Sequence, residues 1–362
     1  MRNATAVALE PALPPEAEMW RAVTDRDASY DGVFFTAVRT TGIFCRPGCT
    51  ARTPLRQNVE FFRTASDALF AGYRPCKRCR PLEPRGEAPE WLRGMLDTIE
   101  REPDRRIRDA DLREAGLDPA RVRRWFQAHH GMTFQAYQRA RRLGRALGQL
   151  TLGDDIVQTA YRSGFESLSG FNDAVRRLAG DSPGRARGTT VIHLTRVLTP
   201  LGPMIAGATE EALCLLEFAE RRMLETQLRR IERQLGAVLV PGETEITRRT
   251  AAELESYFAA ELRDFTVPLA TAGTPFQEDV WRQLRTIPYG ETRSYGEQAR
   301  RIGRPEAVRA VARANGDNRI AIVIPCHRVI GSDGKLTGYG GGLWRKKRLL
   351  ELERGEVGLG LG

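Results

Sequence analysis

The sequence predicts an α+β protein of several domains, and three observations support this class. The chain has 362 residues, which is too long for one ordinary hydrophobic core, so about two to four domains are expected. Two segments rich in proline and glycine, 81–89 and 182–189, have the composition of linkers. The segments that they separate differ in kind. The first holds four of the six cysteines, the second has helical periodicity, and the third mixes strand-like and helical pieces.

Composition and charge narrow the function classes. The chain is 41% hydrophobic and 28% charged, and no apolar run is long enough to cross a bilayer, so no membrane partner is expected. The N-terminal segment lacks the basic and apolar regions of a secretory signal. We therefore expect a cytoplasmic protein whose cysteines bind metal or act as nucleophiles. The net charge of +10 favours a nucleic-acid partner, although a generally arginine-rich composition would give the same excess.

The N-terminal segment contains two short cysteine pairs, Cys45 with Cys49 and Cys76 with Cys79. Each short loop directs two sulfurs toward one point, and four thiolates suit tetrahedral zinc. A module this small has little core of its own, so metal binding would supply much of its folding free energy. On the pattern alone, a purely structural zinc site is the more common case, and spacing does not say which of the four cysteines would react.

The middle segment predicts two helix-turn-helix units. The helix 109–116 ends at a glycine, and Asp118 and Pro119 supply the N-cap and first turn of the next helix. That second helix carries Arg121, Arg123 and Arg124, which we expect to contact DNA. A second unit follows at 156–165 and 167–177, after a connecting helix at 137–147. A plain helical bundle would show similar turns.

The C-terminal segment contains the most specific pattern in the chain. Residues 320–324 are predicted to form a buried strand that Pro325 stops, which places Cys326 at its end, beside His327. The histidine could take the thiol proton. A buried inert thiol next to a histidine is the plain alternative.

Local signals place helices and a core cysteine around this pattern. Thr274 to Gln277 and Ser294 to Glu297 are capping boxes, and helices at 294–302 and 305–315 would form another helix-turn-helix. Upstream, residues 210–235 are predicted to be a long helical stretch, and Cys214 is expected in the core because its neighbours are apolar.

Residues 38–49 and 72–79 resemble the metal-binding module of the Ada family of DNA repair regulators. The resemblance implies one zinc ion held by the four cysteines, with Cys45 accepting a methyl group from a DNA methylphosphotriester. Methylation would remove one negative charge beside Arg46 and the other local cations, so that the module would then bind DNA more strongly.

The middle segment resembles AraC-type DNA-binding domains through Ala160, Gly164, Phe165, Phe171 and the residues that follow to Arg187. Val175 stands where that family usually has a large aromatic, and Gly170 is a weak helix former in the second recognition helix. The resemblance implies a transcription activator, and hence RNA polymerase as a partner besides double-stranded DNA.

The C-terminal segment resembles the methylated-DNA–protein-cysteine methyltransferase family through Asn318, Cys326, His327, Arg328 and Glu353, and through stretches at 274–281, 287–295 and 307–311. The resemblance implies that Cys326 attacks the alkyl carbon on guanine O6 of a flipped nucleotide. His327 would take the thiol proton through a water, and Glu353 would orient the imidazole. Asn318 would fix the adjacent turn.

The same resemblance implies the remaining contacts. Tyr295 would donate a proton toward the departing guanine or contact a phosphate. Arg309 would fill the gap left by the flipped base, and Arg328 and Tyr339 are expected among the DNA-binding residues. Many relatives have a serine where this chain has Gly340. The product is a thioether, so each site would act once, with no diffusible organic cofactor.

The complete expectation is therefore an α+β chain with four parts. They are a zinc-binding methylphosphotriester acceptor at 15–82, an all-α AraC-type module at 88–187, an α/β ribonuclease-H-like subdomain at 190–270, and a winged-helix-like alkyltransferase domain at 272–357. We expect a monomer. The alternatives are a zinc- or redox-sensing transcription factor with an idle alkyltransferase domain, a non-catalytic lesion-binding protein, and a Cys-His hydrolase that turns over.

Overall fold

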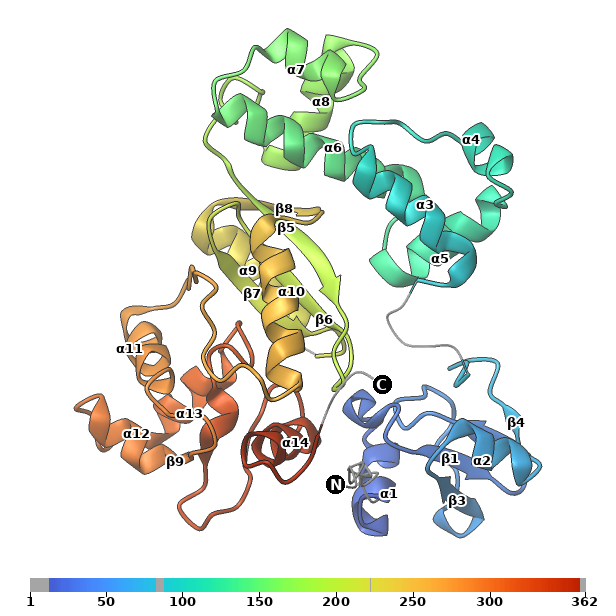
Figure 1. Ribbon diagram of the computed structural model, residues 1–362, viewed down its shortest axis with the longest axis vertical. Coiled ribbons are helices and arrows are strands. Elements are labelled where there is room, and N and C mark those ends of the chain that lie inside the picture. The colour runs from blue at the N-terminus through green and yellow to red at the C-terminus, as the bar shows by residue number, and fades with distance from the viewer. Residues whose placement is uncertain (1–12, 83–87, 222, 359–362) are drawn as a thin grey trace, which may run out of the picture.

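The structure, a computed structural model, describes residues 13–82, 88–221 and 223–358, and it divides into a sheet-containing N-terminal module, an all-helical module and an α/β C-terminal half (Figure 1). The first expected linker, 81–89, falls largely outside the described residues. The second, 182–189, forms turns between the last helix of the middle module and the next strand. Mixed α and β modules in one chain confirm the expected fold class.

The N-terminal module is a four-stranded sheet of order β3-β1-β2-β4. Strand β1 is antiparallel to β2 and β3, and β4 is parallel to β2. A small apolar core forms around Phe35, Ala37, Phe44 and Ala68. The elements are α1 (Glu16–Thr24), η1 (Ala28–Tyr30), β1 (Phe35–Val38), β2 (Ile43–Cys45), η2 (Arg56–Asn58), β3 (Val59–Phe62), α2 (Ala65–Phe70) and β4 (Arg74–Pro75).

The middle module contains the two helix-turn-helix units that the sequence predicts. Asp118 caps α5 by accepting from the Ala120 N–H at 2.9 Å, with Pro119 in the first turn. Val175 is fully buried, so a side chain smaller than the usual aromatic closes this core. The helices are α3 (Glu90–Arg101), α4 (Asp109–Glu114), α5 (Pro119–His130), α6 (Phe134–Thr151), α7 (Ile156–Arg162) and α8 (Leu168–Ala179).

The third part is a sheet of order β7-β6-β5-β8 with two helices. The long helix expected at 210–235 is wrong over its first half. Residues 213–218 form a fully buried strand, because apolar side chains on both faces suit a covered sheet, and the helix begins only at Leu224. The elements are β5 (Thr190–Val197), β6 (Met204–Ala208), β7 (Leu213–Phe218), α9 (Leu224–Leu235), β8 (Ala237–Pro241) and α10 (Glu245–Phe258).

The last part is mainly helical and shares one core with this sheet, since buried residues of β6 and β7 pack with Trp281, Val311 and Leu349. Both capping boxes form as predicted. Helix α13 begins three residues later than expected, after a turn at 305–306. The elements are α11 (Pro275–Leu284), β9 (Arg293–Ser294), α12 (Tyr295–Arg301), α13 (Val308–Gly316), η3 (Cys326–Arg328), β10 (Val329–Ile330) and α14 (Leu343–Glu353).

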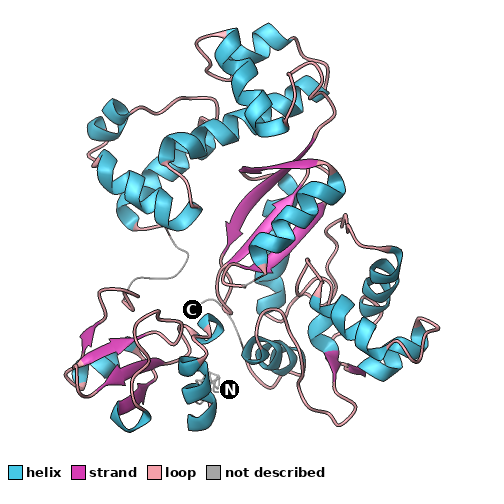
Figure 2. Cartoon of the chain, turned by 180° about the vertical axis from the view of Figure 1, so that it is seen from behind, coloured by secondary structure: helices cyan, strands magenta, loops and turns pink. Residues whose placement is uncertain are grey.

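Within the described residues, the modules are in contact at two places. Helix α6 lies so near strand β8 that a Cβ on Gly144 would come within 2.5 Å of the Val240 side chain. The N-terminal module meets the start of α14, where the rings of Tyr30 and Trp344 have centroids 6.2 Å apart. Figure 2 shows the same arrangement from behind, with the helical module on one side of the central sheet. Among the described residues, no helix is both long and apolar enough to span a membrane.

Candidate functional site

Cys326 begins the short 3-10 helix η3, and a turn at 321–323 precedes it, so the strand expected at 320–324 is wrong. Only Ile320 bridges to Leu216 of β7, and Ile322 adopts a φ of 71°. The segment folds back on itself through the bond from the Ile324 N–H to the Ile320 carbonyl at 2.9 Å. These apolar side chains are buried as predicted, but they fill the core from a compact turn.

Asn318 holds this turn against the nucleophile. Its side-chain amide donates to the Ile324 carbonyl at 2.8 Å and to Cys326 Sγ at 3.1 Å. Its side-chain oxygen accepts from the Ile320 N–H at 3.0 Å. All polar atoms of the Asn318 side chain are thus committed to the turn, which fixes where the sulfur points.

Glu353, at the end of α14, meets His327 in the interior, and both side chains are fully buried. Nε2 of His327 lies 2.8 Å from Glu353 Oε1. Although burial alone would raise the pKa of Glu353, its contacts with His327 and Arg328 hold it well below the usual range, so the carboxylate accepts and Nε2 donates. Nδ1 then carries a lone pair, and it has no partner within the described residues.

The electrostatics keep the resting thiol and imidazole neutral. Burial raises the pKa of the Cys326 thiol, against the opposing effects of the Asn318 hydrogen bond and of the charges on Lys346 and Arg221. Burial also lowers the pKa of His327, and this outweighs the attraction of Glu353. A neutral thiol beside a neutral imidazole is the pair that general-base activation needs.

Two cations close to the nucleophile were missed at the level of sequence. The ammonium of Lys346 is fully buried and donates to the carbonyls of Val329, Thr337 and Gly338. Burial lowers its pKa to about 8, against the attraction of Cys326. Arg221 comes from the loop after β7. Lys346 stands in a run of basic residues on an ordinary helix, so no local pattern distinguishes it from Lys347 beside it, which is exposed.

Arg328 requires a correction, because it is not a DNA-contacting residue. Its side chain is 7% exposed and forms an ion pair with Glu353 at 2.9 Å. A third nitrogen, Nη1, donates to the Ile287 carbonyl at 2.6 Å. The guanidinium therefore lies in the interior and fixes the carboxylate that contacts His327.

The other three residues of this half that were expected to contact DNA differ in their exposure and in their contacts. Arg309 is exposed on α13, where a side chain can enter a duplex. Tyr295 donates its hydroxyl to the Thr337 carbonyl at 3.2 Å, so it is engaged with the glycine-rich loop. Tyr339 is half-buried, with its hydroxyl covered and its ring 6.4 Å from that of His327, so it lines the site instead of the surface.

The four cysteines of the N-terminal module converge as expected, with Cys45 at the end of β2 and Cys76 directly after β4. Their four sulfurs all lie within 4.8 Å of one another. Hydrogen bonds with Cys49 and Cys79, together with burial, raise the pKa of Cys45. The backbone N–H of Arg46 donates to Cys79 Sγ at 3.4 Å. Four clustered sulfurs with an N–H donor fit a tetrahedral zinc ion.

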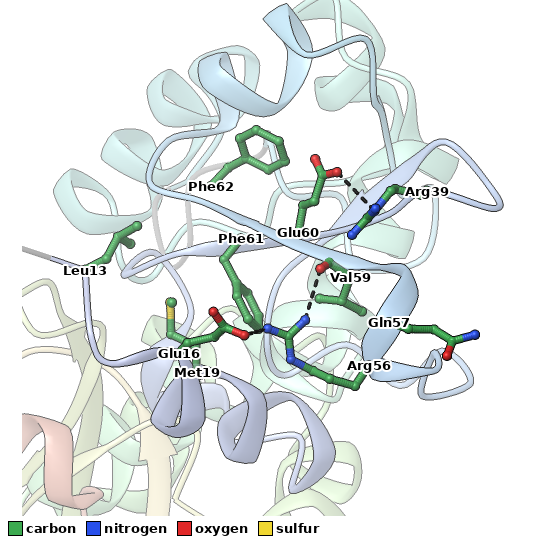
Figure 3. A pocket seen from close by; sticks show the side chains of 10 residues that line it. All are labelled: Leu13, Glu16, Met19, Arg39, Arg56, Gln57, Val59, Glu60, Phe61 and Phe62. Carbon is green, nitrogen blue, oxygen red and sulfur yellow. Dashed lines mark hydrogen bonds and ion pairs between the residues drawn. The ribbon is translucent and has the colours of Figure 1, made fainter.

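Two hollows lie on the described part of this module, and they differ in whether they border the cysteines. The first, about 530 Å³, is bordered by Cys45, Cys49 and Cys76. The second, about 670 Å³, is formed by α1 and β3 and contains none of the four cysteines (Figure 3). There Arg56 pairs with Glu16 and Arg39 pairs with Glu60 at 3.1 Å, so its cations are held by carboxylates of the same module. The hollow beside the cysteines is therefore the better candidate for substrate.

Of the arginines in the first two modules that were expected to contact DNA, one is buried and three are exposed. Arg46 is buried and donates to the Arg80 carbonyl at 3.1 Å, so it supports the cysteine loops, and the contact expected of it requires correction. On α5, Arg121, Arg123 and Arg124 are exposed as predicted. Arg121 lies over the Trp91 ring at 4.1 Å, and the other two pair weakly with nearby aspartates at 3.5 and 4.0 Å.

Together these sites define a class of protein: a DNA-binding chain that carries both a thiol-metal module and a buried, base-assisted cysteine nucleophile. Three family profiles match it. They are described as the metal binding domain of Ada over 18–82, a helix-turn-helix domain over 112–189, and the 6-O-methylguanine DNA methyltransferase DNA binding domain over 275–355.

Relatives match over almost the whole chain. The bifunctional transcriptional activator/DNA repair enzyme Ada of Escherichia coli is 36% identical, covering 93% of this chain and 96% of its own length. The regulatory protein ada of Salmonella typhimurium is 38% identical, covering 95% and 98%. The crystal structure of Mycobacterium tuberculosis OGT in complex with DNA is 45% identical, covers 46% of this chain and 94% of that one, and has a TM-score of 0.40. The chain belongs to the Ada family.

Proposed function

We propose that this chain is a bifunctional DNA repair protein and transcription activator that transfers alkyl groups from DNA irreversibly to Cys326 and to Cys45. The observation that carries the first transfer is the relay in which buried Glu353 accepts from His327 Nε2 at 2.8 Å. That hydrogen bond leaves Nδ1 as a proton acceptor beside the protonated Cys326 thiol.

The reaction at Cys326 balances without a cofactor. The sulfur forms a bond to the alkyl carbon while the bond between that carbon and guanine O6 breaks. The thiol proton passes to His327 Nδ1 through a water, and Glu353 stabilises the imidazolium. The guanine leaves with the electron pair and takes up a proton, for which Tyr295 or water is the donor. The product is a thioether, a poor leaving group, so the site acts once.

The reaction at Cys45 serves regulation as well as repair. Bound zinc would hold the thiols as thiolates at neutral pH. Methylation of Cys45 forms an S–C bond, breaks the C–O bond of the phosphotriester and leaves an ordinary phosphodiester. One negative charge is lost from the cysteine cluster. The exposed cations around it, at positions 52, 74, 77 and 78, then attract DNA more strongly.

The partner follows from this chemistry: double-stranded DNA, both damaged and at promoters. We also expect RNA polymerase as a partner of the activator and a monomeric chain in the cytoplasm. The domain limits 15–82, 88–187, 190–270 and 272–357 stay part of the proposal.

Label transfer tests both reactions at once. The chain is incubated with duplex DNA carrying isotopically labelled methyl groups on guanine O6 and on phosphates, and its peptides are analysed by mass spectrometry. We expect two labelled peptides, one with Cys45 and one with Cys326, and each Cys→Ala variant should lose only its own label. Label on Cys326 alone, with oxidation at Cys45, would favour a redox-sensing regulator instead. Steady turnover would point to a hydrolase.

A further inference from the structure

Arg221 comes from the neighbouring subdomain into the alkyltransferase site. It lies just after β7, about a hundred residues before Cys326 in the chain. Its side chain is 7% exposed and forms an ion pair with Glu217, whose side chain is 1% exposed. Glu217 in turn accepts from the Phe218 N–H at 3.0 Å. The guanidinium is therefore held rigidly from the side of the sheet.

The same guanidinium also donates hydrogen bonds to the backbone of residues 316–318, the segment that carries Asn318. Nη1 donates to the Asn318 carbonyl at 3.1 Å, and Nη2 donates to the Gly316 carbonyl. Residues 316–318 end α13 and present the Asn318 amide, which donates to Cys326 Sγ at 3.1 Å. One continuous set of contacts thus joins Glu217, Arg221, Asn318 and the sulfur.

The same guanidinium borders the glycine-rich loop on the other side of the site. A Cβ placed on Gly340 would lie 2.6 Å from Arg221 Cζ, so a side chain at position 340 would force the guanidinium to move away from its present contacts. Arg221 therefore occupies the space that a side chain at position 340 would need. The absence of a side chain there is explained by the arginine that fills its place.

We propose that Arg221 is a positioning residue for alkyl transfer, which holds the 316–318 turn so that Asn318 orients Cys326, and which requires glycine at position 340. This inference rests on the proposed role of Cys326 as alkyl acceptor. The charged and titratable groups that interact electrostatically with Cys326 are Arg221, Lys346, Tyr295 and Tyr339, and His327 is its neighbour in the chain, with its ring 6.4 Å from that of Tyr339. Of the two cations in this set, Arg221 alone also bonds the turn that carries Asn318.

The first test compares single-turnover transfer rates from a methylguanine duplex to the full chain. Arg221→Met should slow transfer at least about tenfold, as the loss of hydrogen bonds from a charged donor predicts, and Arg221→Lys should restore part of the rate. Arg230→Met is the matched control, since Arg230 bonds Asp317 of the same turn at 3.0 Å from a more exposed position. It should stay within about twofold of the unaltered chain.

Two further measurements distinguish a role of Arg221 in positioning Cys326 from a role in stability alone. The pH profile of Cys326 alkylation by iodoacetamide, followed on its peptide, should move to higher pH in Arg221→Met, because a stabilising cation is lost. Affinity for the same duplex in a Cys326→Ser background should not change. A normal transfer rate, or an unshifted profile in a folded Arg221→Met chain, would overturn the inference.

A double-variant cycle tests the pairing with Gly340. Gly340→Ser should slow transfer in the unaltered chain and cost much less in Arg221→Ala, where the space is free. An equal cost in both backgrounds would contradict the pairing, even if Arg221→Met proved unstable. Absence of alkyl transfer to Cys326 in the unaltered chain would defeat the proposed function itself, a result distinguishable from failure of the variants alone.

Discussion

Cys326 and His327 show how burial sets the protonation state of a reactive pair. Both pKa values move so that the neutral forms persist, upward for the thiol and downward for the imidazole. A free thiolate in this interior would be costly, so the proton leaves the sulfur only as the alkyl group arrives.

This arrangement predicts an unusual pH dependence. His327 can accept the proton only while neutral, and its lowered pKa keeps it neutral above its usual value of about 6.5. The thiol stays protonated at neutral pH because burial raises its pKa. The single-turnover transfer rate should therefore stay within about twofold between pH 6.5 and 8.5 and fall only in more acid solution. A rate that rises about tenfold per pH unit through neutrality would instead indicate attack by free thiolate.

We expect substitutions of the two arginines Arg328 and Arg309 to affect different properties, the first the stability of the chain and the second its transfer rate from duplex DNA. Arg328→Met leaves the buried Glu353 without its cation, and we expect a loss of stability of about 3 kcal/mol. Arg309→Ala removes an exposed side chain and should change stability by no more than about 0.5 kcal/mol, while slowing transfer from duplex DNA.

Urea denaturation followed by tryptophan fluorescence, beside transfer assays on duplex DNA and on free methylguanine base, measures both effects. Transfer from the free base serves as the control, since it needs no intercalating side chain and should be unaffected by Arg309→Ala. Equal stability losses in the two variants would contradict the assignment.

At the scale of elements, local signals were reliable where one turn of chain contains the whole interaction. The capping boxes at Thr274 and Ser294 and the start of α5 at Pro119 form as predicted, because each depends on residues no more than three positions apart. The turn at 320–324 was not foreseen, since an apolar run of five residues is equally compatible with a strand. Long-range contacts with Leu216 and the Asn318 side chain decide it.

The N-terminal module predicts a response to metal removal that is confined to its own elements. Its core is small, and the cluster of Cys45, Cys49, Cys76 and Cys79 joins β2 to β4. Chelation should therefore unfold residues 18–82. Hydrogen exchange should lose its protection over β1 to β3, while transfer to Cys326 continues.

The control for this experiment is a chain with Cys214→Ala, which removes a core cysteine that binds no metal and should leave the response to chelator unchanged. Protection of β1 to β3 that persists in chelator would show that the module folds on its apolar core alone.

At the scale of the whole molecule, the proposed function requires three kinds of DNA contact from one basic chain with a net charge of +10. Methylation of Cys45 changes one charge in a single module, so its effect on promoter binding is electrostatic. We expect the methylated chain to bind its promoter about tenfold more tightly at low salt.

This advantage should shrink as salt screens the charge. Affinity titrations of methylated and unmethylated chain at several salt concentrations measure it, with Cys45→Ala as a chain that cannot be switched. Equal affinities at low salt would remove the switch, and an advantage independent of salt would indicate a conformational change instead.

The sequence by itself was enough to predict the three kinds of module, the cluster of four cysteines and the pairing of Cys326 with His327, because each is contained in a short motif or a composition change. Tertiary structure alone decided three other features. Arg328 serves Glu353 in the interior, Lys346 is buried among carbonyls, and Arg221 reaches the site from another subdomain. In each case the cation is buried because carboxylates or carbonyls from distant parts of the chain surround it. Packing brings these partners together, so the sequence contains no periodic or regularly spaced pattern that reveals them.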